Sequence, residues 1–303
     1  MVRRGLVLGC GGTVGGAWQM GALHALEHAL GWDPRTADVI VGTSAGGTAA
    51  VMLGSGVGTA EMVAAQRDEP TARPSVRTFC CTPPAPLPAI PFGVPPLRLT
   101  VGGLRHGAVH TVLAGLAPTG RTRTDFLDDL VADLAPGGWV SHPATWLVAT
   151  GVGTGDRVAL GRASASPCTV RDAVRATWAI PGWYPPVEIG TDRYVDGGAR
   201  STASADMMLG TGVDEVVVVA PMAGVGAESA GGVGGRLERL LRGPMSRRLD
   251  AEIRTLEATG IRVLRVHPTA AELAVMGPNF MDPGRRRAAL ETAIKHVPER
   301  ISV

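Results

Sequence analysis

The sequence predicts an α/β fold, a three-layer α/β/α sandwich built on a mostly parallel central sheet. Short runs of β-branched residues alternate with helix-forming segments, as in folds whose parallel strands are connected by helices. Some of these runs, such as Glu215–Ala220, are almost continuously apolar, which is typical of strands buried on both faces. The first two strand-to-helix connections are rich in glycine, and both carry residues suited to chemistry.

The chain is expected to form a single domain over residues 1–303. This length is sufficient for one large hydrophobic core, and the sequence contains no internal repeat or clear linker. We expect the core at about 5–220 and a C-terminal extension of helices and a strand at 236–303.

The first 60 residues are expected to form a strand, a loop and a helix, followed by a second strand, a turn and a second helix. The first unit consists of a strand at Gly5–Leu8, a glycine loop at Gly9–Val14 and a helix at Gly15–Leu30. The second unit has its strand at Asp38–Val41 and a compact helix-forming run at Thr48–Leu53.

A proline-rich segment follows, from Pro70 to Pro96. Proline lacks a backbone N–H and disrupts both helix interiors and central strands, so this segment is not expected to form either. We expect a surface excursion that forms a rim or lid over the site.

The rest of the chain continues the alternation of strands and helices. A helix is expected to begin after a capping residue at Thr124 and to run through Leu134. The other expected strands are Thr145–Thr150, Arg157–Leu160, Arg193–Val195, Glu215–Ala220 and Ile261–Val266. The other expected helices are Val170–Trp178, a helical region from Leu237 and a terminal helix from Pro283, and the glycine-rich Ala223–Gly235 is expected to be mobile.

Composition argues against several classes of protein. The net charge is +2 and 18% of residues are charged, so nothing indicates nucleic-acid binding. The four cysteines have neither metal-ligand spacing nor the pattern of a disulfide framework, and they are Cys10, Cys80, Cys81 and Cys168. A reduced compartment, the cytoplasm, is therefore expected, and the sequence gives no indication of the oligomeric state.

Two stretches without charged residues, Gly5–Leu26 and Val39–Ala60, are each 22 residues long, enough to span a membrane. Glycine clusters divide each of them into a strand and a helix. Arg3 and Arg4 precede an apolar run, but Leu6–Leu8 is too short for a signal peptide. Both stretches are therefore expected to form soluble core.

Ser44 is the candidate nucleophile. It is the central residue of a GxSxG motif, Gly42–Gly46, between a predicted strand and a predicted helix. In this context the serine is held clear of the sheet at a helix N-terminus, where the helix dipole favours developing negative charge. The alternative is a glycine-rich turn without a chemical role.

The loop Gly9–Gly15 can be interpreted in two ways. A dinucleotide-binding GxGxxG pattern counted from Gly9 has Val14 at its last glycine, and Asp38 begins the second strand instead of ending it. The stronger interpretation is an oxyanion hole, with the N–H groups of Gly11 and Gly12 donating to a tetrahedral intermediate. Each such donor contributes about 2.7–4 kcal/mol of transition-state stabilisation.

Asp196 is the candidate base. It ends a predicted strand and precedes two glycines, a context that also fits an ordinary turn. An aspartate with an ordinary pKa of about 3.9 is a poor base at neutral pH, so burial must raise that pKa.

The three motifs, in this order, resemble those of the patatin-like phospholipases. The corresponding stretches are Cys10–Gly15, Gly42–Gly46 and Asp196–Gly198, and Ala179–Val187 before the aspartate is also similar. The resemblance extends from about Gly5 through the aspartate motif, with weaker similarity through the strand at 215–220.

This resemblance implies a patatin-like fold and a serine acyl hydrolase that acts on the carboxylic esters of lipids. It implies that Ser44 and Asp196 form a catalytic dyad that works through an acyl-enzyme, with Gly11 and Gly12 as the oxyanion hole. It also implies that catalysis needs no metal, no cofactor and no histidine.

The chain departs from the family pattern at two positions. Cys10 replaces the first glycine of the loop, and Val14 occupies the place where the family usually has arginine or lysine. If that cation supports the oxyanion loop or a substrate phosphate, phospholipid preference and full catalytic power are reduced here, whereas the backbone donors remain.

Other functions stay open at this point. His267 follows the last predicted strand and completes the chain order Ser–Asp–His of a triad esterase or peptidase, although a strand-end polar residue has the same appearance. The glycine loop could bind a nucleotide, and a catalytically weak lipid-binding or adaptor protein is a third alternative. His24 and His28 share a helix face without a third metal ligand, so a structural role is expected for them.

Four of the twelve aromatic residues lie within 17 positions before the candidate base: Trp178, Trp183, Tyr184 and Tyr194. They either line an acyl pocket or present an apolar mouth for transient contact with a membrane surface. Plain core packing is the alternative.

Overall fold

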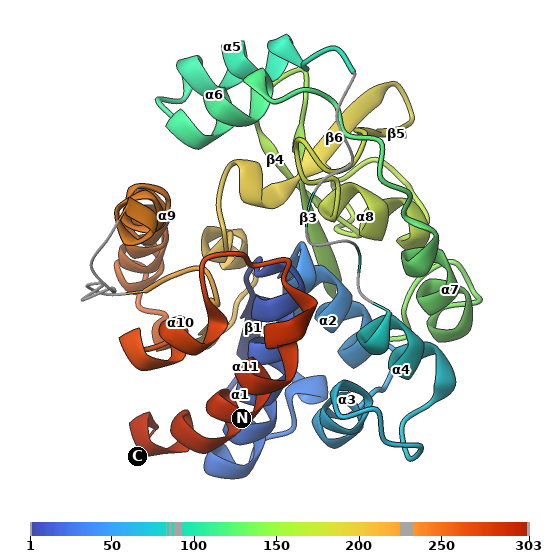
Figure 1. The fold of residues 1–303 in the computed structure, drawn as a ribbon, viewed down its shortest axis with the longest axis vertical. Coiled ribbons are helices and arrows are strands. Elements are labelled where there is room, and N and C mark those ends of the chain that lie inside the picture. The colour runs from blue at the N-terminus through green and yellow to red at the C-terminus, as the bar shows by residue number, and fades with distance from the viewer. Residues whose placement is uncertain (1, 83, 85–86, 88–92, 225–232, 302–303) are drawn as a thin grey trace.

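The computed structural model describes residues 2–82, 84, 87, 93–224 and 233–301, with the backbone alone at 233–242. Within these residues, an eight-stranded sheet has the order β5-β6-β3-β2-β1-β7-β8, with β4 also paired to β3 (Figure 1). The strands are β1 (Arg4–Leu8), β2 (Val39–Thr43), β3 (Thr145–Gly151), β4 (Arg157–Leu160), β5 (Val187–Ile189), β6 (Asp192–Asp196), β7 (Glu215–Val219) and β8 (Arg262–Val266).

The sheet is parallel from β3 through β2, β1 and β7 to β8. At its other end the pairs β3–β4, β3–β6 and β5–β6 are antiparallel. The predicted α/β sandwich with a mostly parallel sheet is confirmed.

Eleven α-helices surround the sheet in the described part of the chain. They are α1 (Gly12–Leu30), α2 (Ala45–Gly54), α3 (Thr59–Gln66), α4 (Pro74–Cys81), α5 (Leu97–Arg105), α6 (Val109–Leu116), α7 (Asp125–Leu134), α8 (Val170–Thr177), α9 (Val233–Glu257), α10 (Ala270–Met276) and α11 (Arg286–His296). Short 3₁₀ turns include η2 (Gly197–Ala199) and η3 (Ala205–Met208), which follow β6.

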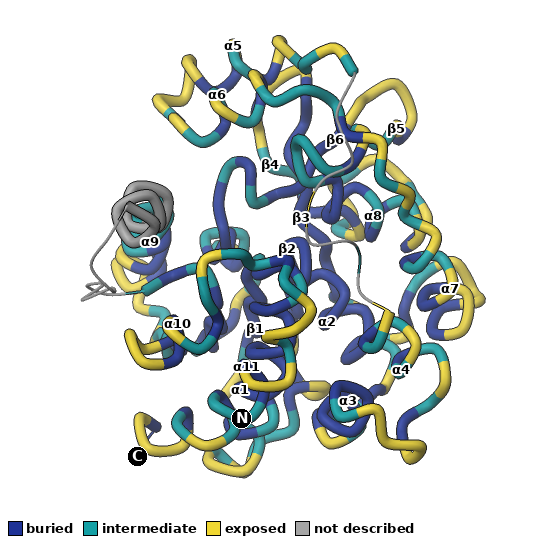
Figure 2. Tube along the Cα trace, in the orientation of Figure 1, coloured by how far each residue is buried: buried dark blue, intermediate teal, exposed yellow. Residues whose placement is uncertain are grey.

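Two hydrophobic cores lie on the two faces of the sheet because successive strand side chains point to opposite faces. Leu6 and Leu8 of β1 pack into the larger core with α1, α2, α8 and α11. Val7 packs into the other core, together with Leu249 and Leu256 of α9. Figure 2 shows the resulting buried centre and the exposed outer surfaces of the helices.

The proline-rich segment differs in part from its prediction. Pro74–Cys81 forms helix α4, so the expectation that no regular helix occurs between Pro70 and Pro96 was wrong. Pro74 begins this helix, where its missing N–H costs nothing, and no further proline occurs until residue 83. Residues 83, 85–86 and 88–92, on which much of the predicted rim or lid falls, lie outside the described residues.

Several predicted boundaries also shift. Helix α1 begins at Gly12 rather than Gly15, and Gly12 itself has a φ of +58°, which a residue with a side chain would avoid. Thr124 is the N-cap residue of α7, but its side chain makes no capping hydrogen bond. Helix α9 begins at Val233, four residues before the expected start, and the expected mobility of Ala223–Gly235 falls largely on 225–232, outside the described residues.

Neither of the charge-free stretches forms a continuous apolar helix. Each of them contains a strand of the sheet and a helix that packs on it. In the part of the chain that the structure describes, none of the helices combines the length and apolar character needed to cross a bilayer.

Candidate active site

Ser44 lies in the sharp turn between β2 and α2, as its motif predicts. It is the N-cap residue of α2, it is buried, and its backbone torsions are φ 57° and ψ −122°. A non-glycine residue in this region is strained, and such strain is concentrated at functional sites. The flanking glycines are required by close packing, since a Cβ atom on Gly46 would lie 2.2 Å from the Leu8 carbonyl oxygen, and one on Gly42 would lie 2.4 Å from that of Gly46.

Thr177, at the end of α8, supports the strained turn. The Ser44 N–H donates to Thr177 Oγ1 over 2.8 Å, and the Thr177 hydroxyl donates to the Val148 carbonyl of β3 over 2.6 Å. Thr177 is fully buried, so the serine backbone is tied to the neighbouring strand through a single side chain. The sequence contains no local signal for this role of Thr177, and no motif predicts it.

Asp196, at the end of β6, comes close to Ser44 through the strand order. It pairs with Ala149 of β3, and the preceding residue of β3, Val148, pairs with Thr43, next to the serine. Gly198 N–H donates to Asp196 Oδ1 over 2.7 Å. Gly198 has little room for a side chain, because a Cβ atom there would lie 3.0 Å from the same carboxylate oxygen.

Burial controls the protonation of Asp196. The carboxyl is removed from water and its pKa rises to about 7, although hydrogen bonding from the Ser44 side chain and from the Gly198 N–H opposes the rise. Loss of hydration penalises the charged form of a carboxyl, whereas hydrogen-bond donors favour it. The result is an aspartate that exchanges its proton near neutral pH and contacts a serine hydroxyl.

The glycine loop between β1 and α1 supplies backbone donors. The N–H groups of Gly9 and Cys10 are used by Val219 and Thr202 carbonyls, at 2.9 and 2.7 Å. The N–H groups of Gly11 and Gly12 make no hydrogen bond to any described residue, and both glycines line the same cavity as Ser44 and Asp196. The N-termini of α1 and α2 therefore meet at this cavity, where their dipoles favour negative charge.

The cavity has a volume of about 320 Å³, and its walls are mainly apolar. Its apolar lining residues are Leu113, Ala114, Ala117, Ile180, Pro181, Ala199, Met222, Met245 and Phe280. Besides Asp196, the titratable side chains of the lining are those of Cys10 and His110, and among the described residues that line it there is no lysine or arginine. The contribution of α6, including His110, was not predicted from the sequence.

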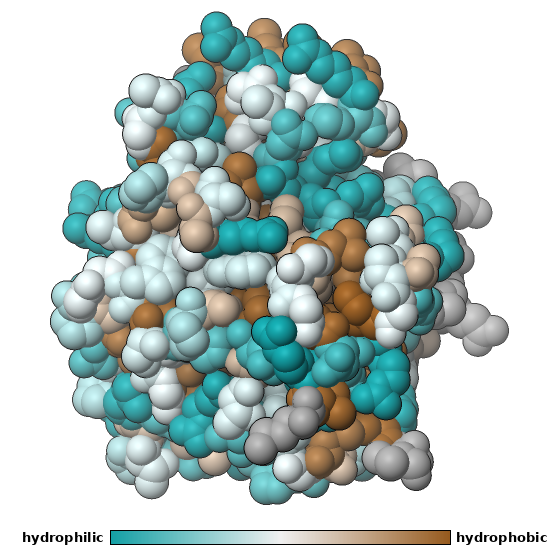
Figure 3. Space-filling view, turned by 180° about the vertical axis from the view of Figure 1, so that it is seen from behind, coloured by the Kyte–Doolittle hydropathy of each residue, from teal (hydrophilic) through white to brown (hydrophobic). Residues whose placement is uncertain are grey.

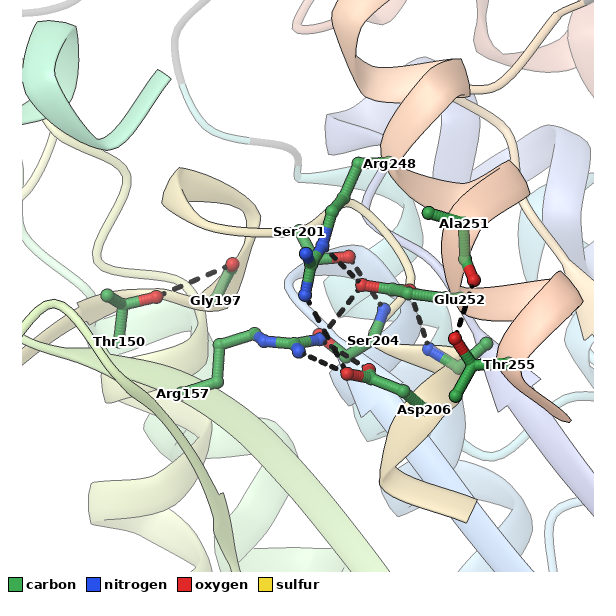
Figure 4. A network of polar contacts seen from close by, with 11 residues as sticks. Thr150, Arg157, Gly197, Ser201, Ser204, Asp206, Arg248, Ala251, Glu252 and Thr255 are labelled. Carbon is green, nitrogen blue, oxygen red and sulfur yellow. Dashed lines mark hydrogen bonds and ion pairs between the residues drawn. The ribbon is translucent and has the colours of Figure 1, made fainter. Parts of the chain in front are cut away.

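A buried ionic network holds the segment that follows Asp196 (Figure 4). Arg157 of β4 donates to Asp206 at 2.6 and 2.7 Å and to Glu252 of α9 at 3.0 Å. Glu252 also accepts from the Ala205 N–H at 2.9 Å and from Arg248 at 3.0 Å. Burial raises the pKa of Glu252, and the charge of Arg157 opposes that rise. The network connects α9, β4 and η3, and so fixes the chain beyond η2.

The histidines considered in the sequence analysis, His267, His24 and His28, lie outside this cavity. His267 lines a separate hollow with Arg265 and Arg300, where burial and then the two arginine charges lower its pKa to about 4. His24 and His28 contact each other with ring centroids 4.5 Å apart. Within the described residues, no group of three or more His, Cys, Asp or Glu side chains is arranged to hold a metal ion.

Two further sequence expectations concern side chains near the site. Val14 is fully buried in the larger core, and its N–H donates to the Phe280 carbonyl over 3.0 Å. Trp178, Tyr184 and Tyr194 are buried in the same core, and the partly buried Trp183 packs against it. None of these four aromatic residues lines the cavity at Ser44. For this cluster the packing interpretation is the one that the structure favours.

Comparisons with known proteins identify a family that matches most of the chain. Residues 6–209 match the family described as patatin-like phospholipase. A comparison with curated proteins gives no match. Among solved structures, the crystal structure of VipD from Legionella pneumophila aligns with 13% identity and a TM-score of 0.48, over 99% of this chain and 67% of VipD.

Proposed function

The chain belongs to the patatin-like phospholipase family, a family of lipid acyl hydrolases, and we propose that it cleaves carboxylic esters of lipids through a Ser44–Asp196 dyad. The observation that carries this proposal is the contact between a strained serine and a buried aspartate whose pKa is about 7. A base with a pKa near the working pH is best matched to proton transfer at neutral pH.

In the proposed reaction, Ser44 Oγ attacks the ester carbonyl carbon and its proton passes to the Asp196 carboxylate. The N–H groups of Gly11 and Gly12 donate to the oxyanion that forms. The intermediate collapses to an acyl-Ser44, and the leaving alcohol takes the proton from Asp196. Asp196 then accepts a proton from water as that water attacks the acyl-enzyme, and it returns this proton to Ser44 Oγ as the fatty acid leaves, which restores both residues.

We propose that the acyl chain of the substrate occupies the cavity. Its aliphatic and methionine walls favour a hydrocarbon chain over a charged group. The buried Val14 supplies no cation for a phosphate, and the described lining contains neither lysine nor arginine. A substrate head group would therefore remain at the cavity mouth, and phosphate is not required for binding.

We also propose that residues 1–303 act as one domain. The last strand, β8, extends the same sheet as the site, and α11 packs against α1. The C-terminal segment therefore supports the helix whose N-terminus carries the oxyanion donors.

A fluorophosphonate probe tests this function, because it reacts covalently only with an activated serine. The labelled peptide, identified by mass spectrometry, is expected to contain Ser44. Ser44→Ala should abolish labelling, and Asp196→Asn should slow it by about 100-fold or more. Ser55→Ala, at the other end of α2, is the matched control and should label at the wild-type rate.

Turnover of a soluble ester such as p-nitrophenyl butyrate completes the test. Hydrolysis is expected from the wild type and the Ser55 control but from neither site variant. Folded wild-type protein that does not label, or that labels at another residue with Ser44→Ala fully active, would refute the dyad.

A further inference from the structure

The exposed large hydrophobic side chains are concentrated in one part of the molecule. Among the described residues, those that are roughly half exposed or more are Val2, Leu87, Val94, Leu97, Val101, Leu104, Val109, Leu113 and Leu116. All but Val2 lie between residues 87 and 116. Single exposed apolar residues are common on soluble proteins, whereas a contiguous group indicates an interaction surface.

Six of these residues form two regular stripes on α5 and α6. Leu97, Val101 and Leu104 are spaced i, i+4, i+7 along α5, with exposures of 57, 49 and 67%. The same spacing recurs along α6, at residues 109, 113 and 116, with exposures of 64, 54 and 52%. Residues with this spacing share one face of a helix, so each helix presents an apolar face to solvent.

The opposite faces of α5 and α6 are closely packed on small residues. A Cβ atom on Gly103 would lie 2.6 Å from the Val112 nitrogen, and one on Gly115 would lie 2.4 Å from the Thr100 nitrogen. The two helices therefore form a compact pair, here called the α5–α6 hairpin, at one end of the molecule (Figure 1). Leu99 of α5 is buried, but the six aliphatic side chains of the two stripes stay exposed, where they gain nothing from the removal of apolar surface from water.

The hairpin is also positively charged. Residues 93–124 contain four arginines and no aspartate or glutamate. Arg98, Arg105 and Arg121 are exposed and form no ion pair with a described residue, whereas Arg123 pairs with Asp125. Viewed from behind, this end of the molecule shows hydrophobic side chains beside strongly hydrophilic ones (Figure 3).

The hairpin is continuous with the cavity at Ser44. Ala114 lines the cavity, and Leu113, which belongs to the exposed stripe of α6, lines it as well. A continuous apolar surface thus leads from the outside of the hairpin to Ser44.

We propose that the α5–α6 hairpin docks the protein on an anionic lipid bilayer. The two apolar stripes, which include Leu97 and Leu104 on α5 and Val109 on α6, enter the boundary between head groups and acyl chains. Arg98 and Arg105 contact the anionic head groups. An apolar helical face flanked by basic residues is the arrangement that lies in a membrane interface. The inference that docking brings lipid to Ser44 rests on the proposed acyl hydrolase function. The docking itself requires no turnover.

Vesicle cosedimentation tests the docking. All vesicle measurements use the Ser44→Ala background, so that lipid cleavage does not alter the vesicles. Binding is compared between vesicles of phosphatidylcholine alone and vesicles in which a quarter of the lipid is phosphatidylglycerol. We expect clear binding to the anionic vesicles, much weaker binding to the neutral ones, and loss of affinity as salt screens the charges.

Two variants and one control separate the apolar and charged contributions. Leu97→Ser, Leu104→Ser and Val109→Ser together should reduce binding to anionic vesicles by at least about tenfold, from the lost burial of three aliphatic side chains. Arg98→Gln with Arg105→Gln should reduce it by about fivefold for each arginine and weaken its salt dependence. Arg254→Gln with Arg262→Gln, exposed arginines on α9 and β8, should leave it unchanged.

The outcomes distinguish docking from catalysis. With Ser44 restored, the triple serine variant should hydrolyse soluble p-nitrophenyl butyrate at the wild-type rate, since none of the three positions lines the cavity. No binding to either kind of vesicle, or binding that survives the triple substitution, would overturn the inference and leave the proposed hydrolase intact. A dimer in light scattering that the triple variant dissociates would also overturn it, since a second copy would then cover the hairpin.

Discussion

Replacing Asp196 with asparagine should stabilise the protein above neutral pH while it lowers the reactivity of Ser44 by about 100-fold or more. The carboxyl is buried and its pKa is raised to about 7 by the loss of hydration. In the unfolded chain an aspartate has an ordinary pKa of about 3.9. Folding therefore penalises the charged form of this side chain, and asparagine, a neutral side chain of the same shape, avoids that penalty.

The magnitude follows from the difference between the two pKa values. About three pKa units at 1.36 kcal/mol each give about 4 kcal/mol. Between about pH 4 and pH 7 the folded protein retains a proton that the unfolded chain has lost, so the stability of the wild type falls as pH rises through this window and levels off above it. The advantage of Asp196→Asn should thus be about 4 kcal/mol at pH 8 and less than about 1 kcal/mol at pH 4.

Urea denaturation followed by far-UV circular dichroism measures these free energies of unfolding at both pH values. Asp129→Asn removes an exposed carboxylate of α7 that forms no ion pair with a described residue, and as the matched control it should change stability by less than about 0.5 kcal/mol. The reasoning fails if Asp196→Asn gives no stabilisation at pH 8, or if its gain is the same at pH 4 and pH 8.

Four further predictions concern the same site. kcat/KM for p-nitrophenyl butyrate should rise with pH and level off above about 7, as Asp196 loses its proton, and a flat profile from pH 5 to 8 would exclude it as the base. Thr177→Val should leave the buried Ser44 N–H unpaired, lower the free energy of unfolding in urea by about 1–3 kcal/mol, and reduce kcat more than it changes KM. Thr177→Ser keeps the hydroxyl and should retain the stability and kcat of the wild type. Gly46→Ala should unfold the protein in the same assay, because its Cβ would lie 2.2 Å from a backbone oxygen, whereas Gly153→Ala, with open space around it, should be tolerated. His267→Ala should leave kcat/KM within about twofold of the wild type, and a loss of 100-fold or more would favour the triad.

The parts of the fold and site that could be predicted are those with local signals. The turn at Ser44 has a glycine on each side and a strand and helix beyond them, so its backbone follows from a few consecutive residues. Asp196 could be identified as a strand-end carboxylate, but its contact with Ser44 depends on β6 pairing with β3, which in turn pairs with β2. The resemblance to a family supplied that connection.

The parts that could not be predicted depend on tertiary contacts. Thr177 supports the serine turn from a helix more than a hundred residues away, and an isolated threonine at a helix end carries no signal of that role. The α5–α6 hairpin contradicts the usual rule, because six of its large aliphatic residues are exposed whereas the glycines of the two helices are buried. Helical periodicity could have identified both helices, but it would have assigned the stripes of Leu97 and Val109 to the core.

The candidate site combines three features that each oppose folding. Ser44 holds a strained backbone conformation, Asp196 is buried at the expense of its charge, and the N–H groups of Gly11 and Gly12 lack partners among the described residues. Such features persist only where the surroundings leave the chain no alternative. Here those surroundings are the contacts at Gly42 and Gly46, the hydrogen bond that Thr177 accepts from the Ser44 N–H, and the buried Arg157–Glu252 pair. Because stability is lost at the groups that would perform the chemistry, relieving any one of the three should strengthen the fold and weaken the reaction.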